Sequence, residues 1–258
     1  MINDLVSIIM PSFNCGKYVE ETIRSVIAQT YQNWEIIFID DCSTDDTIKT
    51  VNELKNEDSR IRLYQNKRNI GAALSRNYAL QKANGRWIAF LDSDDVWESM
   101  KLEKQIRFMV ENQYAFSYTN YQEINSESKT TGVYVSGPKY VSKREMYKFC
   151  WPGCLTVMYD ASKIGLIQIK DIQKNNDYAM WLKVCKKAGC YLLDECLAKY
   201  RRGRVGSLSS HNITTMIKWH YKLWHETEEK NSISAIWYTG LNLFYGFYKK
   251  MKYVQKKF

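Results

Sequence analysis

The residues best suited to chemistry are carboxylates that directly follow an apolar segment. Asp92, Asp94 and Asp95 lie within four residues of one another, immediately after the apolar run 87–91. Carboxylates held this close repel one another unless water, a cation or a charged partner balances them. Their oxygen atoms suit a hard divalent cation that also binds phosphate oxygens. A solvated acidic turn before a helix explains the same spacing, so both interpretations stay open on spacing alone.

Alternating strands and helices must position these acids. Short apolar segments predict strands, and apolar residues at helical spacing predict helices between them. We expect strands at 5–10, 34–39, 61–65 and 87–91, and helices at 18–29, shortly after 43, and at 72–82. Pro11 is expected to end the first strand, and Ser43 is expected to cap the second helix. Strands and helices that alternate in this way form a mostly parallel, doubly wound α/β sheet.

Polar residues follow each predicted strand. Ligands of such sheets bind beside the carboxyl ends of the strands. The four segments found there are Pro11-Ser12-Phe13-Asn14, Asp40-Asp41-Cys42-Ser43, 66–69, and Asp92-Ser93-Asp94-Asp95. Because the carboxyl ends of parallel strands meet at one edge of the sheet, the sequence predicts a single composite binding site there.

The second half of the chain is less regular. We expect helices at 101–112 and 178–188, and strands at 115–123, 154–159, 190–193 and 197–201. The polar segment 127–137 is expected to form a turn or loop. From Ile213 onward the sequence is helical in character, so we expect a main domain over 1–210 and a C-terminal helical appendage over 211–258.

Several segments, in this order, resemble the family 2 glycosyltransferases of the nucleotide-sugar-binding, Rossmann-like GT-A fold. They are VSIIMPSFN at 6–14, WEIIFIDDCSTDDT at 34–47, NIGAALSRN at 69–77, GRWIAFLDSDD at 85–95 and NDYAMWL at 176–182. Tyr200-Arg201 and GSLS at 206–209 are similar to the family's closing loop. The resemblance covers roughly residues 5–210 and implies that the main domain transfers a sugar from a nucleotide.

The resemblance implies how the donor is bound. Pro11 and Phe13 would lie beside the base, with the Phe13 ring giving it an apolar face. Asp41 would accept a hydrogen bond from an N–H group of the base, which suits uracil and therefore a UDP-sugar. Asp92 would hold the ribose hydroxyls, and Ser93 would be a further donor-binding residue.

Two basic positions are also implied to lie near the donor. Arg76 would be close to the nucleotide, with a charge on a helix surface as the alternative. Arg201 and Arg204 follow the last predicted strand, and arginine suits bidentate contact with phosphate. They would hold the diphosphate of the donor or of a lipid-linked acceptor. A solvated basic loop is the competing interpretation.

The resemblance also implies a metal and a catalytic base. Asp94 would bind Mn²⁺ or Mg²⁺, which offsets the charge of the leaving diphosphate. Asp177 would take the proton of the acceptor hydroxyl, with a helix cap as the alternative. The family commonly has Glu-Asp here, so Asn176 removes a charge that would raise the pKa of the base. One base and one metal suffice for a single displacement, which inverts the anomeric centre and gives a β-linkage from an α-linked donor.

The C-terminal region carries the whole net charge of +9. Residues 1–196 contain 25 basic and 25 acidic residues, whereas residues 197–258 contain 12 and 3. The segment 233–248 is rich in aromatic and aliphatic residues but too short and too polar to span a bilayer. The lysines that follow it are Lys249, Lys250, Lys252, Lys256 and Lys257. This composition predicts a helix that lies on an anionic membrane surface; a helical hairpin packed on the main domain is the alternative.

Composition excludes other classes. A chain with 45% hydrophobic residues, 25% charged residues, 12 Gly and 3 Pro is neither disordered nor collagenous. The first residues lack the pattern of a signal peptide, and seven cysteines without one favour reduced thiols in the cytoplasm.

Together these features predict a bacterial hexosyltransferase that is peripheral at the inner face of the cytoplasmic membrane. It would move a hexose from a UDP-sugar to a lipid-diphosphate-linked or oligosaccharide acceptor in O-antigen or capsule assembly. A nucleotidyltransferase with a similar sheet is the alternative enzyme. A nucleic-acid-binding protein would not explain a neutral first 196 residues with acids at strand ends, so no nucleic-acid partner is expected.

Overall fold

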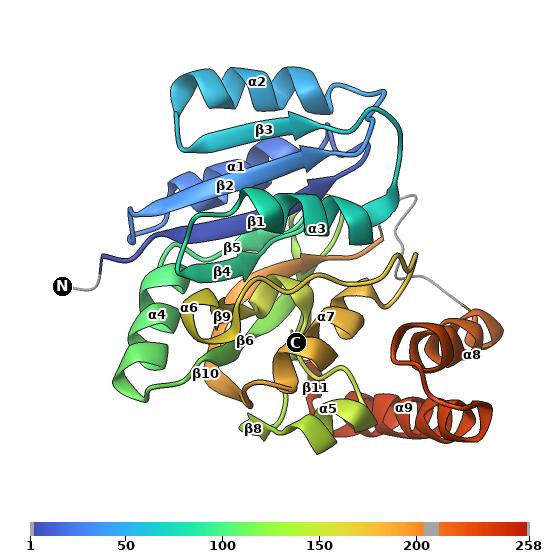
Figure 1. Ribbon diagram of the computed structural model, residues 1–258. Helices are drawn as coiled ribbons and strands as arrows, with labels where there is room; N and C mark the ends of the chain where they lie inside the picture. Colours follow the sequence, from blue (N-terminus) through green and yellow to red (C-terminus); the bar gives the residue numbers. More distant parts are fainter. Residues whose placement is uncertain (1–2, 204–211, 257–258) are drawn as a thin grey trace.

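The computed structural model describes residues 3–203 and 212–256, which form one large sheet flanked by helices (Figure 1). Most strands follow one another across the sheet in the order β11-β7-β6-β9-β4-β1-β2-β3. Their bounds, in that order, are Val254–Lys256, Thr130–Val135, Phe116–Ile124, Met158–Asp160, Trp87–Phe90, Val6–Ser12, Trp34–Asp40 and Ile61–Gln65. Strand β10 (Cys190–Arg201) pairs with β6 and with the short strands β5 (Val96–Trp97) and β8 (Tyr140–Val141).

The first half of the sheet is parallel and covered on both faces. Strand β1 pairs in parallel with β2 and β4, and β2 with β3. Successive β1 side chains enter different cores: Ile9 packs with the residues of α3 (Gly71–Lys82), and Ile8 with those of α1 (Val19–Ile27) and α2 (Thr47–Glu57). The nearly all-apolar strands of the sequence are therefore explained by burial on both faces, and the doubly wound α/β prediction is confirmed.

The first strand is longer than predicted, because it runs through Pro11 to Ser12. Backbone groups of alternate residues point to the same neighbouring strand. The Ile9 carbonyl accepts a hydrogen bond of 3.1 Å from the N–H of Leu91, so the backbone of Pro11 also points to the β4 side. Strand β4 has ended there, at Phe90. The missing N–H of proline therefore costs no sheet hydrogen bond, and the expectation that Pro11 ends the strand was wrong.

The second helix begins at Thr47, so the expected cap at Ser43 was also wrong. The Ser43 hydroxyl instead accepts a hydrogen bond of 2.9 Å from the backbone N–H of Asn14. This bond joins the loop after β1 to the loop after β2. Ser43 therefore organises the carboxyl edge of the sheet and not the helix.

The second half of the sheet is mixed and was harder to predict. Strand β9 pairs antiparallel with β4 and β6, β7 pairs antiparallel with β6, and β10 runs parallel to β6. The expected loop at 127–137 contains β7, whose partners β6 and β11 lie elsewhere in the chain. The two short strands expected after residue 190 are one strand, β10, with register shifts around Cys196. The strand expected at 154–159 starts as a 3-10 turn at Cys154–Thr156.

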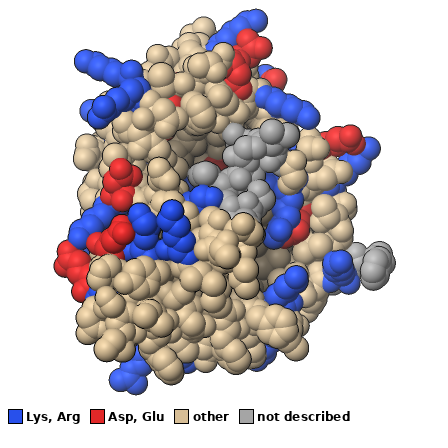
Figure 2. All heavy atoms as spheres, turned by 90° about the vertical axis from the view of Figure 1, so that its right-hand side faces the viewer, with Lys and Arg blue, Asp and Glu red and all other residues tan. Residues whose placement is uncertain are grey.

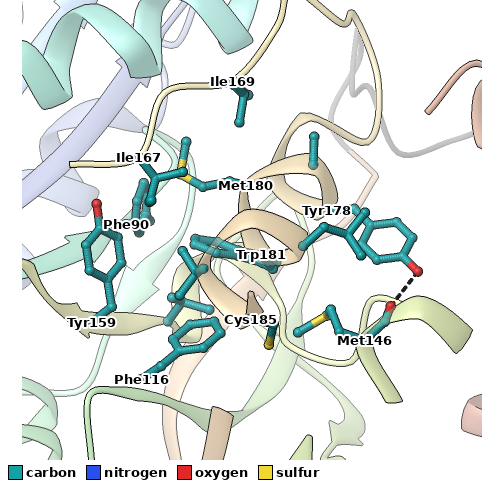
Figure 3. Packing of buried hydrophobic residues seen from close by; sticks show 14 of the residues in the cluster. Phe90, Phe116, Met146, Tyr159, Ile167, Ile169, Tyr178, Met180, Trp181 and Cys185 are labelled. Carbon is teal, nitrogen blue, oxygen red and sulfur yellow. Dashed lines mark hydrogen bonds between the residues drawn. The ribbon is translucent and has the colours of Figure 1, made fainter. Parts of the chain in front are cut away.

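Six further α-helices complete the described residues. They are α4 (Lys101–Glu111), α5 (Lys143–Lys148), α6 (Ala161–Ile164), α7 (Asn176–Cys185) and α8 (Ile213–Lys222), and α8 continues through a π-helical turn before α9 (Ser232–Lys252). Trp181 of α7 lies between Phe90 and Phe116 of the sheet (Figure 3), with ring-centre distances of 4.9 and 5.9 Å. Helix α7 is thus anchored through its apolar face to the end of β4.

The C-terminal helices pack on this same core. Leu223, Trp224 and Ala235 are fully buried in the cluster that contains Trp181. This arrangement corresponds to the packed-hairpin alternative of the sequence analysis. The expected boundary between 210 and 211 falls outside the described residues. Among the helices of residues 3–203 and 212–256, none has both the length and the apolar character needed to cross a bilayer.

Candidate active site

The carboxyl ends of the parallel strands converge on one face of the molecule. These strands point to the right in Figure 1, and Figure 2 looks onto that side. The face is hollowed, with Lys and Arg side chains beside the hollow. The loops that follow β1 and β2 are joined there, because the Asn14 side chain accepts a hydrogen bond of 2.8 Å from the N–H of Thr44. Asn14 and Cys42 have positive φ angles of 48° and 71°, which turn the chain sharply after each strand.

Asp41 is buried at this edge, and its carboxylate is held by the chain itself. Oδ1 accepts hydrogen bonds from the Asn66 side chain at 2.8 Å and from the N–H of Ile70 at 2.9 Å. Oδ2 accepts one from the N–H of Gly71 at 2.8 Å. Asp41 therefore satisfies free N–H groups at the start of α3. The family resemblance implied that Asp41 would accept a hydrogen bond from the nucleotide base. The structure shows in addition that Asp41 anchors the start of α3, which the sequence did not indicate.

The preceding acid has an oxygen without a partner. Asp40 Oδ2 accepts a hydrogen bond of 3.0 Å from the N–H of Ser43, whereas its Oδ1 is buried and has no hydrogen-bond partner among the described residues. The same holds for the hydroxyl of Ser12, which lies opposite Asp40 in the β1–β2 register. Buried polar atoms without partners are rare and cost free energy. This pair was not expected from the sequence, where the family resemblance indicates the second acid, Asp41, as the one that faces the ligand.

The apolar residues expected beside the base are placed at the same edge. Pro11 is buried within β1, whereas the Phe13 side chain, just after the strand, is 44% exposed. Large aromatic rings are seldom exposed without a reason, although single cases are common. The Phe13 side chain therefore lies partly exposed at the rim of the strand ends.

The acids after β4 form a turn. The N–H of Asp95 donates a hydrogen bond of 3.1 Å to the carbonyl of Asp92, and Ser93 and Asp95 are buried while Asp92 and Asp94 are partly exposed. Burial, together with the neighbouring carboxylates of Asp94 and Asp92, raises the pKa of Asp95 well above its usual value. Burial and the two neighbouring acids thus both favour the protonated form of Asp95.

A divalent cation fits this donor set. Carboxylate oxygens are the ligands that Mg²⁺ and Mn²⁺ prefer, and positive charge would relieve the repulsion around Asp95. Within residues 3–203 and 212–256, no three His, Cys, Asp or Glu side chains are arranged to hold a metal ion. A cation at Asp94 would therefore take most of its ligands from phosphate and water, which is a common way for proteins to hold Mg²⁺.

Arg76 of α3 connects this turn to α7. Its guanidinium donates hydrogen bonds to the carboxylate of Asp92 and to the side-chain oxygen of Asn176. The residue is only 5% exposed, so the helix-surface alternative was wrong. Burial opposes the charge of Arg76, but Asp92, Cys154 and Asp177 outweigh it and raise the pKa of the guanidinium above its usual value. Arg76 is therefore a fixed cation between the acids of β4 and the start of α7.

Asp177 lies in the first turn of α7, beside this cation. The residue that precedes the helix is Asn175, with a φ of 58° and no side-chain capping bond, so Asp177 is not the N-cap. Its Oδ1 accepts a hydrogen bond of 2.8 Å from the N–H of Tyr178. Burial and, to a smaller degree, Asp92 raise the pKa of Asp177, while Arg76 acts in the opposite direction. A carboxylate with a raised pKa is a better proton acceptor than an ordinary one.

Arg201 contacts the acidic turn after β4, but its side chain points into the protein interior. Its side chain is fully buried and forms an ion pair of 2.6 Å with Glu21 of α1. Nε donates to the carbonyl of Asp94 at 2.7 Å, and the backbone N–H of Arg201 donates to Asp95 at 2.8 Å. Arg201 therefore holds the acidic turn in place, and the expected direct contact with a diphosphate was wrong. Arg204 lies outside the described residues.

Lys249 of α9 reaches the same region and was missed. Its Nζ donates a hydrogen bond of 2.6 Å to the carbonyl of Trp151. Burial lowers the pKa of Lys249 to about 8, against the influence of Cys150 and Asp177. From the sequence, Lys249 was expected to lie on the protein surface with the other C-terminal lysines. A usable signal existed, because Lys249 follows the polar residue Asn242 by seven positions and so shares its helix face.

Comparison with known proteins adds a family and a fold. Residues 7–159 match the family model described as glycosyl transferase family 2. The putative teichuronic acid biosynthesis glycosyltransferase TuaG of Bacillus subtilis (strain 168) is 39% identical over 234 residues, which is 90% of this chain and 92% of that one. The Escherichia coli protein WfaP, a UDP-Glc:alpha-D-GlcNAc-diphosphoundecaprenol beta-1,3-glucosyltransferase, is 40% identical over 215 residues, or 83% and 84% of the two chains.

Solved structures agree in fold. TarS 1-349 of S. aureus, crystallised with UDP-GlcNAc, superposes with a TM-score of 0.68 at 21% identity, covering 89% of this chain and 69% of that one. The family model spans more than half of the chain, and the acids, Arg76 and the start of α7 meet at one edge of the sheet. The chain belongs to glycosyl transferase family 2.

Proposed function

We propose that the protein is an inverting hexosyltransferase of surface-polysaccharide assembly. It takes a hexose from a UDP-sugar and joins it through a β-glycosidic bond to a hydroxyl of a lipid-diphosphate-linked glycan. Two Escherichia coli relatives, WfaP and the 44% identical WfgD, are named as UDP-glucose β-1,3-glucosyltransferases that act on GlcNAc-diphosphoundecaprenol. Glucose is therefore the first candidate for the transferred sugar.

One observation carries the proposal: Arg76 joins Asp92 and Asn176, which are 16 and 100 residues away in the chain. The contact brings the acids after β4, suited to a nucleotide diphosphate and its metal, next to Asp177, suited to deprotonate an acceptor. A transferase needs both groups within the length of one bound sugar. A protein that only bound nucleotides would have no use for the second carboxylate.

On the donor side, the uracil ring lies against Phe13 and Pro11, and an acid after β2 accepts its N–H group. Asp41 is the acid that the family resemblance indicates, and Asp40 is the one with an unpartnered buried oxygen. Asp92 and Ser93 bind the ribose, with Asp92 oriented by Arg76. The basic residue Arg204 is proposed to contact the diphosphate, and Arg201 supports the same site indirectly through the backbone of Asp94.

Asp94 holds the cation, Mn²⁺ or Mg²⁺, that the family resemblance implies. When bound, such a cation supplies Lewis-acid stabilisation of the leaving diphosphate. The chain's own residues do the rest: Arg201 fixes the carbonyl of Asp94, and Arg76 limits the repulsion between Asp92 and Asp177. Asp177 accepts the proton of the acceptor hydroxyl as the oxygen attacks the anomeric carbon from the side opposite the diphosphate. One displacement inverts the anomeric centre.

The acceptor proposed here is attached to a membrane lipid. The protein therefore works in the cytoplasm, as a peripheral protein at the inner face of the cytoplasmic membrane.

A donor screen tests the function. The full chain is incubated with UDP-glucose, UDP-galactose, UDP-GlcNAc or UDP-GalNAc, a divalent cation, and a synthetic lipid diphosphate that carries GlcNAc. We expect release of UDP that requires the acceptor, and a product whose new linkage is β by proton NMR. The same lipid without its sugar is the matched control. Formation of pyrophosphate from UTP and a sugar phosphate, without sugar transfer, would identify a nucleotidyltransferase and reject the proposal.

A further inference from the structure

Helix α9 presents an apolar face to solvent. Its exposed large residues lie three, four or seven positions apart, spacings that place them on one side of a helix, so they form one stripe along it. This stripe, called here the α9 outer face, consists of Ile233, Ile236, Trp237, Phe244, Phe247, Tyr248 and Met251, with exposed fractions between 36% and 82%. Single exposed apolar residues are normal on protein surfaces, whereas a continuous patch marks an interaction site.

The inner face of α9 is more polar than its outer face, the reverse of an ordinary surface helix. Thr239 and Asn242 are buried there. The Asn242 side chain accepts a hydrogen bond of 2.8 Å from the indole of Trp224, and it donates to the carbonyl of Lys148 at 2.8 Å and to the hydroxyl of Tyr178 at 3.1 Å. These bonds fix the rotation of the helix. The α9 outer face is therefore held outward and cannot turn into the core without losing them.

Positive charge borders the α9 outer face. At 100° per residue, Lys250 and Lys252 fall on opposite sides of the stripe, and both are exposed. Lys256 of β11 is exposed as well. The sequence from 230 to 258 contains no Asp or Glu. An apolar stripe bordered by lysines complements a surface with anionic headgroups above an apolar interior.

We propose that the α9 outer face docks on an anionic phospholipid bilayer, with the helix lying in the plane of the interface. The aromatic and aliphatic side chains enter the boundary between headgroups and acyl chains, and Lys250 and Lys252 contact acidic headgroups. A second copy of the chain is a poorer occupant, because α9 offers no acidic side chain to pair with these lysines. The proposed transferase function explains why docking would be useful, and the proposal rests on it only in that respect. Docking itself requires neither donor nor acceptor.

The α9 outer face lies on the same helix as Lys249, which reaches the candidate active site, so docking would bring the membrane close to that site. Lys249 points inward from the same helix and binds the carbonyl of Trp151, and it is close enough to Asp177 for their charges to interact. A bilayer against the α9 outer face would thus be separated by the width of α9 from Lys249 and the nearby Asp177, the residue proposed to act on the acceptor. A lipid-linked sugar would reach Asp177 without leaving its membrane.

Vesicle flotation with the full chain tests the proposal. We expect binding to vesicles that contain phosphatidylglycerol, weak binding to vesicles of phosphatidylcholine alone, and a decrease as salt rises, since screening shortens the reach of the lysines. The affinity of the variant W237S/F244S/F247S for both kinds of vesicle should fall by at least about tenfold. The variant K250Q/K252Q should lose binding mainly to the anionic vesicles.

The control removes exposed apolar residues from other parts of the protein. M100S/V110S/L166S changes side chains that are 42%, 37% and 44% exposed, and it should bind vesicles as the wild type does. All variants should transfer sugar normally to a short water-soluble acceptor, which shows that they are folded.

Two results would overturn the proposal. The first is a flotation result: wild-type protein that does not float with anionic vesicles, or W237S/F244S/F247S protein that floats as well as the wild type. The second is a wild-type dimer in light scattering that becomes monomeric in W237S/F244S/F247S, which would assign the face to a second copy of the chain. Failure of the transferase function is distinct, because it would leave vesicle binding intact while no donor is consumed.

Discussion

Arg76 shows how one residue can set the charge of a whole site. It is buried, and its guanidinium binds Asp92 and Asn176. An acid at position 176 would pair with this cation and draw its charge away from Asp177. The amide of Asn176 accepts the hydrogen bond without adding a negative charge. The positive charge of Arg76 is therefore shared by Asp92 and Asp177, and the absence of the family's usual Glu is compatible with activity.

Replacing Asp94 by alanine should abolish metal-dependent transfer and leave the fold intact. Burial first, and then Asp94 and Asp92, raise the pKa of Asp95, so folding favours protonated Asp95. The stability of the metal-free protein therefore falls as pH rises from about 4 through that raised pKa, and Asp94 is responsible for part of this cost. Removing Asp94 relieves that part of the cost. At pH 7 the free energy of unfolding of the metal-free variant should equal or exceed that of the wild type in urea titrations. Asp46→Ala, an exposed acid after β2, is the control. A fully active D94A protein would show that the cation lies elsewhere.

Asp177→Asn should lower turnover by roughly 10²–10⁴-fold, because the variant cannot accept the acceptor's proton. UDP binding, measured by calorimetry, should change little. The exposed Asp171→Asn serves as the control. If UDP binding is lost together with turnover, Asp177 belongs to the donor site and not to the acceptor side.

The pH profile gives a second test of Asp177. Its pKa is raised, so the deprotonated base is lost at a higher pH than for an ordinary aspartate, whose pKa is about 4. The value of kcat/KM should therefore rise with pH through a midpoint above about 4. This limb should be missing from the residual activity of D177N. An ascending limb that persists unchanged in the variant would report another group.

Some residues of the candidate site can be predicted from the local sequence, and others cannot. The acids at 92–95 and Asp177 stand next to segments whose structure is predictable, so their positions followed from the sequence. The partner of Arg201 is Glu21, 180 residues away, and Lys249 binds Trp151, 98 residues away. No local pattern encodes such contacts. Arg201 was therefore expected to contact a diphosphate and Lys249 a membrane surface, whereas the fold buries Arg201 and turns Lys249 toward Trp151.

Strands and helices were predicted correctly where the local sequence alone determines their structure. Strands β2 and β3 and helix α4 lie within one or two residues of the expected positions, because apolar runs and helical spacing are local signals. Strand β7 was expected to be a loop because the segment 127–137 is polar. It is a strand because β6 and β11 supply its hydrogen bonds. Tertiary pairing decided the structure there, and propensity did not.

Helix α9 should depend on one polar side chain. Asn242→Ala removes an acceptor from the buried indole of Trp224 and donors from two further oxygens. Leaving buried polar groups unpaired costs about 1–3 kcal/mol each, so the free energy of unfolding should fall by at least about 1 kcal/mol. Chemical denaturation measures the change, and Ser232→Ala, an exposed position of the same helix, should be neutral. Equal stability of N242A and wild type would mean that α9 is held by its apolar contacts alone.

For the whole molecule, the C-terminal segment completes the fold. Ala235 lies in the main apolar cluster, Asn242 reaches Tyr178 of α7, and β11 extends the sheet beside β7. A chain cut after Ser232 should lose cooperative thermal unfolding and lose transfer to soluble and membrane-bound acceptors alike. Circular dichroism and the two assays measure this. A truncated protein that melts cooperatively near the wild-type temperature and uses the soluble acceptor would show that 1–232 is self-sufficient.

The pairing of β11 with β7 also has a consequence for synthesis. Residues 130–135 leave the ribosome more than a hundred residues before residues 254–256, their antiparallel partners, are made. Domains tend to fold from the N-terminus as they emerge. The parallel half of the sheet can form early, whereas Trp224 and Tyr147 await the helix that covers them. The nascent chain thus passes through a stage with an uncovered aromatic surface and an unpaired strand edge. At that stage it is a natural client for chaperones and is vulnerable to aggregation.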